Sequence, residues 1–213
     1  MARDETRIYD QRRQRGPLLK GKNLTFFWLG VNLEYIRLAS FHRYSVKVKN
    51  HILDNLKYAK KRALKLHLQI SVPESLSYWI RYLERTYVSE YERIDASDGD
   101  TLSKEISNLK SLISRNVYAP DWHAFWLGIN IEYLKRAAYH KYTVLDEHFI
   151  LTNFKAARGN LKKLKISGEP MNVIDYWIRY LEGKYRVFGE KLNDIDADNL
   201  YRETEDLIEL LGG

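Results

Sequence analysis

The sequence predicts an all-α protein, a tandem duplication of a small four-helix bundle with a basic N-terminal arm. Its main support is an internal repeat. The segment FWLGVNLEY at residues 27–35 returns as FWLGINIEY at residues 125–133, and YWIRYLE at 78–84 returns at 176–182. Both pairs are 98 positions apart (125 − 27 and 176 − 78). Apolar residues recur at helical spacing, and no alternating strand pattern of useful length competes.

The repeat predicts three parts: a basic arm at 1–22, a first copy at 23–115 and a second copy at 121–211. Pro120 marks a break before the second copy. The first helix of each copy is expected to start after Asn23 or Asp121, which are good N-caps, and to end near His42 or His140. Gly30 and Gly128 in these helices indicate a close helix approach.

The second helix is expected to start at Ser45 or Thr143. Its apolar residues in the first copy follow at spacings of four, three, four and three, which gives one buried stripe. The stripe consists of Ile52, Leu56, Ala59, Ala63 and Leu66, and in the second copy of Ile150, Phe154, Ala157, Leu161 and Leu164. Pro73 and Pro170 suit the first turn of a third helix, which carries YWIRYLE. An Asp-rich loop, at 95–100 in the first copy and 193–198 in the second, and a short fourth helix complete each copy.

Composition excludes several classes of protein. The 213 residues include 45% hydrophobic residues, enough for a folded core, so a disordered chain is excluded. The absence of cysteine excludes disulfide scaffolds, thiolate metal sites and cysteine nucleophiles. We expect no membrane span and no secretory signal, and hence a cytoplasmic protein unless it is part of a larger assembly. No cofactor motif occurs, so no cofactor is expected. The few Met residues and many Tyr residues indicate a thermophilic source.

The net charge of +7 (35 − 28) is distributed unevenly. The arm has seven cations and three acids, for +4. Residues 45–70 carry +6 (7 − 1) and residues 143–168 carry +3 (5 − 2). Such a pattern is typical of a protein that binds a nucleic-acid backbone, although a solvated tail and ordinary solvated helix faces would also produce it. The candidate phosphate ligands are Arg3, Arg7, Arg12, Arg13, Arg15, Lys20, Lys22, Arg43, Lys57, Lys60, Lys61, Lys65, Lys141, Lys155, Arg158, Lys162 and Lys163.

Glu34 and His42 recur as Glu132 and His140, and these four residues form an alternative metal site if their helices face each other. The phrase FWLGVNLEY is similar to segments of tandem ferritin-like bundle proteins. Arg37 and His42 (Arg-x-x-x-x-His) also resemble the motif of the HEPN ribonucleases. In the second copy the corresponding pair is Lys135 and His140, with Arg136 one residue closer. A metal- or ligand-binding protein or a nuclease is therefore the alternative interpretation.

A basic arm followed by helical bundles resembles, in layout, the major capsid proteins of filamentous and rod-shaped archaeal viruses. In that family a dimer of small helical proteins wraps double-stranded DNA. The resemblance implies that one tandem chain takes the place of a dimer and self-assembles on DNA by phosphate contacts, without enzymatic activity. It also implies a location in the virion, as the alternative to the cytoplasm. A scaffold that binds another protein is a further possibility.

Overall fold

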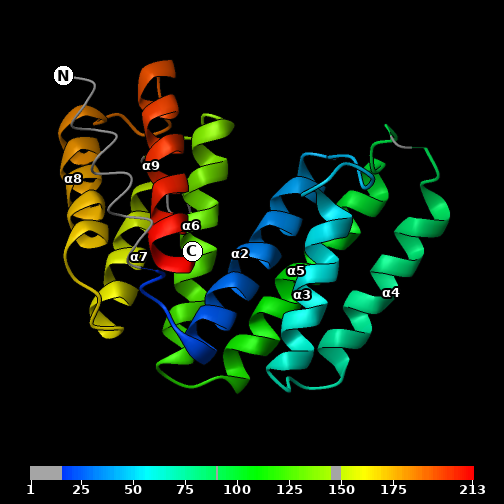
Figure 1. Ribbon diagram of the computed structural model, residues 1–213. Helices are drawn as coiled ribbons and strands as arrows, with labels where there is room; N and C mark the ends of the chain where they lie inside the picture. Colours follow the sequence, from blue (N-terminus) through cyan, green and yellow to red (C-terminus); the bar gives the residue numbers. More distant parts are fainter. Residues whose placement is uncertain (1–15, 90, 145–149) are drawn as a thin grey trace.

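The computed structural model describes residues 16–89, 91–144 and 150–213, and these residues form eight α-helices (Figure 1). Within these ranges there is no strand, only two isolated β-bridges. The predicted all-α fold class is confirmed. The first copy contains α2 (Gly21–Phe41), α3 (Ile52–Lys65), α4 (Ser71–Thr86) and α5 (Ala96–Asn116), and the second contains α6 (Asp121–Tyr139), α7 (Ile150–Lys163), α8 (Glu169–Lys184) and α9 (Asp194–Gly212).

The two copies have the same internal arrangement. Helix α2 packs on α3 and α5, and α6 packs on α7 and α9. The outermost helices are α4 on one side and α8 on the other, so α2 and α6 occupy the middle (Figure 1). Burial follows the predicted stripe, since Ile52, Leu56 and Ala59 in the first copy and Phe154 and Leu161 in the second are fully covered.

The two copies meet through their first helices, which are buried almost throughout. Gly30 lies against the carbonyl of Phe125, and Gly128 lies against the carbonyl of Phe27, so closely that a Cβ at either glycine would overlap the oxygen. The expected close helix approach is therefore an approach of backbone to backbone between the copies. The contacts are reciprocal, as in an isologous dimer interface.

Several helix boundaries differ from those predicted. Helix α2 begins at Gly21, so Asn23 lies in its first turn, and Asp121 is the first residue of α6 rather than its cap. Helix α3 begins at Ile52 and not at Ser45, because Ser45 pairs with Arg93 in an isolated antiparallel bridge. Thr143 pairs with Lys191 in the same way.

The fourth helices are long rather than short. The carboxylate of Asp95 accepts a hydrogen bond from the amide of Asp98, and the side chain of Asn193 accepts one from the amide of Asp196. These N-caps start α5 and α9 inside the segments that were expected to be Asp-rich loops. Acidic residues in the first turn also suit the positive end of a helix dipole.

The segment before α2 is tied to the end of α9. The amides of Leu18 and Leu19 donate hydrogen bonds of 3.1 Å to the carbonyls of Leu210 and Leu211. The indole of Trp28 donates to the carbonyl of Gly212 at 3.1 Å. None of the helices in the described ranges is long and apolar enough to cross a membrane.

Candidate functional site

A symmetrical cluster of aromatic and ionisable side chains lies where the C-terminal ends of α2 and α6 come together. The imidazoles of His42 and His140 are stacked, with 3.6 Å between their centroids and 14° between their planes. Each imidazole also bonds to a tyrosine of the other copy: Tyr44 Oη lies 2.9 Å from His140 Nε2, and Tyr142 Oη is hydrogen-bonded to His42 Nε2. Repeated residues 98 positions apart thus form one joint cluster, which we call the axis cluster.

Both imidazoles of the axis cluster are held in the neutral form. Burial, the neighbouring His42 and the guanidinium of Arg136 lower the pKa of His140 to about 4. Burial and Arg136 also lower the pKa of His42. Burial raises the pKa of Tyr142 to about 12, so its hydroxyl stays protonated. Protonation of both stacked imidazoles would place two positive charges next to each other and near the guanidinium, which is unfavourable in free energy.

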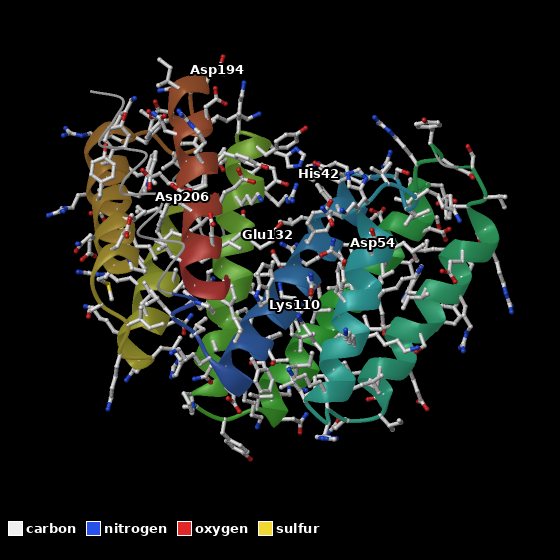
Figure 2. All side chains as sticks on the ribbon, in the orientation of Figure 1. His42, Asp54, Lys110, Glu132, Asp194 and Asp206 are labelled. Carbon is white, nitrogen blue, oxygen red and sulfur yellow. The ribbon has the colours of Figure 1, made fainter. Side chains whose placement is uncertain are left out.

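Two buried carboxylates lie about two helical turns below the axis cluster, and Figure 2 labels one of them, Glu132, together with His42 and Lys110. Glu34 is 1% exposed and pairs with Arg37 Nη2 at 2.5 Å and with Lys110 from α5. Glu132 pairs with Arg136 Nε at 2.8 Å, and the guanidinium of Arg136 lies 4.3 Å from the ring centre of Tyr35.

The two carboxylates differ in charge compensation. Burial opposes ionisation of Glu34, but Lys110 and Arg37 more than offset it and lower its pKa. Burial raises the pKa of Glu132, and Arg136 offsets this only in part. Two differences in sequence accompany this: Lys135, at the position equivalent to Arg37, pairs with Glu205 on α9 at 2.8 Å, and Ile208 stands where the first copy has Lys110.

The alternative metal site is not formed. Glu34 and Glu132 are each engaged by cations of the chain, and the two histidines stack on one another. Throughout the part of the chain that the structure describes, no three His, Asp or Glu side chains gather as ligands of a metal ion.

The surface above the axis cluster combines aromatic and cationic side chains. Phe41 is 60% exposed and Tyr139 is 61% exposed, and each lies edge-on to the adjacent histidine. Arg43 and Lys141 follow directly in left-handed backbone conformations and are exposed. Exposed rings beside cations are the elements that bind unstacked bases and phosphates.

The predicted phosphate ligands fall into three groups. Arg3, Arg7, Arg12, Arg13 and Arg15 lie outside the described residues. Lys22, Lys57, Lys141, Lys155 and Arg158 form ion pairs with Asp121, Glu84, Asp194, Glu182 and Asp175. The remaining seven have no acidic partner within the ranges described: Lys20, Arg43, Lys60, Lys61, Lys65, Lys162 and Lys163.

Sequence reasoning missed the role of Tyr44 and Tyr142 in the axis cluster, although it named Arg136 next to the pair of Lys135 and His140. A signal for them was present, because His-Arg-Tyr at 42–44 returns as His-Lys-Tyr at 140–142. What the repeat cannot supply is the pairing of α2 with α6, which brings these residues together. Comparison of the chain with known protein families, with curated proteins and with solved structures found no match.

Proposed function

We propose that the protein binds and coats nucleic acid, in the first place double-stranded DNA, through phosphate contacts that do not depend on sequence. The observation that carries the proposal is the set of exposed lysines on the second helices of both copies that have no acidic partner in the described chain: Lys61 and Lys65 on α3, Lys162 and Lys163 at the end of α7. A lysine without an intramolecular partner can replace a condensed counterion on a phosphate.

The placement of these lysines suits a coat protein. Figure 1 shows α3 in front of α5 and α7 behind α9, so the two helices that carry these lysines lie on opposite sides of the molecule. One chain therefore offers nucleic acid two separate surfaces. The reciprocal packing of α2 and α6 supports the idea that the fused copies take the place of a dimer, which the resemblance in layout to archaeal viral capsid proteins implies.

Binding as a function of salt concentration tests this proposal. We expect similar affinities for unrelated DNA sequences and a steep fall of affinity with salt, with a slope of about −0.9 for each phosphate neutralised. Electron microscopy of the protein mixed with linear DNA should show filaments. A shallow salt slope, a clear sequence preference, or binding without any filament would contradict the coat-protein proposal.

The axis cluster favours a second candidate function, metal-independent cleavage of a phosphodiester. The observation that favours it is that the two histidines meet beside Arg136, with Arg37 one turn below. The structure thus places an arginine near both histidines, whereas in the sequence only the first copy has the Arg-x-x-x-x-His spacing. A neutral imidazole can accept a proton, and a guanidinium can stabilise a phosphorane charge. The exposed rings of Phe41 and Tyr139 would hold the adjoining bases.

Labelled single-stranded RNA incubated with a chelator tests this candidate. Cleavage should persist in the chelator and fall by about a hundredfold or more in a His42→Asn, His140→Asn double variant. DNA binding and the helical circular dichroism spectrum of that variant should be unchanged. Absence of cleavage by the wild-type protein, or equal cleavage by the double variant, would exclude the function.

A further inference from the structure

A groove of about 510 Å³ runs between α4 and α5 of the first copy. Tyr78 and Tyr82 stack on one another along its α4 side, with 6.0 Å between ring centroids, and Tyr78 is 55% exposed. The α5 side carries two carboxylates, Asp98 and Glu105. The groove is lined by Ser75, Tyr78, Trp79, Tyr82, Asp98, Thr101 and Glu105.

The two carboxylates of this groove are oriented by neutral donors. Asp98 accepts hydrogen bonds from Tyr82 Oη at 2.9 Å and from Tyr87 Oη at 2.8 Å. Glu105 accepts one from Ser75 Oγ at 2.7 Å. Neither carboxylate forms an ion pair with any residue that the structure describes. The groove therefore presents two carboxylates next to aromatic faces, and neither of them is ion-paired with a described residue.

The second copy shows what the same residues hold when a cation is present. There the ammonium of Lys184 lies 2.8 Å from Asp196 Oδ2 and 2.7 Å from Tyr180 Oη. It also lies 5.1 Å from the centre of the Tyr180 ring and 5.7 Å from that of the Tyr185 ring. Asp196, Tyr180 and Tyr185 are the counterparts of Asp98, Tyr82 and Tyr87. The repeated Asp-Tyr-Tyr set is thus an ammonium site in the second copy.

The first copy lacks this internal ammonium, because Thr86 stands at the position equivalent to Lys184. We propose that the groove binds a linear aliphatic diamine, with one ammonium at Asp98 between Tyr82 and Tyr87 and the other at Glu105. The carboxylates are seven residues apart on one helix, which places them about 10 Å apart along its axis. The methylene chain would lie along Trp79 and Tyr78, and cation–π attraction adds to the ion pairs.

A reciprocal exchange between the copies tests the proposal. Calorimetric titration of the full chain with diaminooctane should give one site in the wild-type protein. Thr86→Lys supplies the missing ammonium and should weaken binding by about tenfold or more. Lys184→Thr, the matched change in the second copy, leaves the groove of the first copy untouched and should bind diaminooctane with the affinity and stoichiometry of the wild type. Thermal unfolding of both variants checks that they are folded.

The length of the ligand provides a second test. Diaminobutane, which is too short to reach both carboxylates, and the monoamine butylamine should bind more weakly than diaminooctane. Glu105→Gln should bring diaminooctane down to the affinity of butylamine and leave butylamine binding unchanged. No binding by the wild-type chain, equal binding by Thr86→Lys, or weakened binding by Lys184→Thr would overturn the proposal.

Discussion

Glu34 and Glu132 occupy the same position in the two copies and are buried to the same degree, yet their charges are compensated differently. Glu34 has two cations, Arg37 and Lys110, whereas Glu132 has Arg136 alone in direct contact. The position of Lys110 is taken in the second copy by Ile208. The two copies share the same backbone arrangement, but their buried carboxylates are neutralised by different cations.

The largest effect should come from removing the better compensated carboxylate. Glu34→Gln leaves two largely buried cations unpaired, and we expect it to cost about 3–5 kcal/mol of stability at pH 7. Glu132→Gln should cost less, because burial already disfavours the charged form of that residue. Chemical denaturation of the two variants measures the difference. Equal destabilisation would show that the two environments are equivalent and would contradict the comparison.

A smaller effect should follow from forcing α2 and α6 apart at their close contact, where each copy has a glycine. Gly30→Ala places a Cβ against the carbonyl of Phe125 and should cost about 1–3 kcal/mol through overpacking. Gly159→Ala is the matched control, because this glycine of α7 has open space around it and alanine is the better helix former by about 1 kcal/mol. Thermal melts should therefore move in opposite directions, and a melt of Gly30→Ala like that of the wild type would argue against the close α2–α6 contact.

A pH dependence should arise at the axis cluster. The folded-state pKa of His140 is about 4, below the value of 6.5 for a free side chain, so the unfolded chain holds this proton more tightly. The stabilisation is complete above pH 6.5 and decreases as the pH falls towards 4. The melting temperature of the His140→Asn variant should change less between pH 7 and pH 5 than that of the wild type. An unchanged slope would mean that this histidine does not titrate as the stacked geometry requires.

Much of the fold follows from local patterns, because the buried stripe of α3, Pro73 in the first turn of α4 and the repeat itself are properties of short segments. The predicted start of α3 was wrong because it depends on a long-range bridge between Ser45 and Arg93, which no local pattern contains. The fourth helices were predicted too short because Asp95 was assigned to a loop, whereas it caps α5.

The candidate sites were harder to predict than the fold. The lysines of α3 and α7 were found from charge alone, but which of them are ion-paired depends on partners such as Glu84 on another helix. The axis cluster depends on the pairing of two helices 98 residues apart in sequence. Gly30 and Gly128 indicated close packing but did not identify the partner, which is the backbone of the other copy.

Nucleic-acid binding by two charge-matched variants tests the central proposal most directly. One replaces four lysines without acidic partners in the described chain by Gln, namely Lys61, Lys65, Lys162 and Lys163. The other replaces four ion-paired cations by Gln, namely Lys57, Lys141, Lys155 and Arg158. Both variants have the same net charge, so only the location of the removed cations differs.

We predict that the first variant binds duplex DNA far more weakly than the wild type, with a salt slope shallower by about 0.9 for each phosphate that is no longer neutralised. The second variant should bind nearly as well as the wild type, because its cations are already neutralised by Glu84, Glu182, Asp175 and Asp194. Equal weakening of both variants, or unchanged binding by the first, would contradict the assignment of Lys61, Lys65, Lys162 and Lys163 as the phosphate-binding surface.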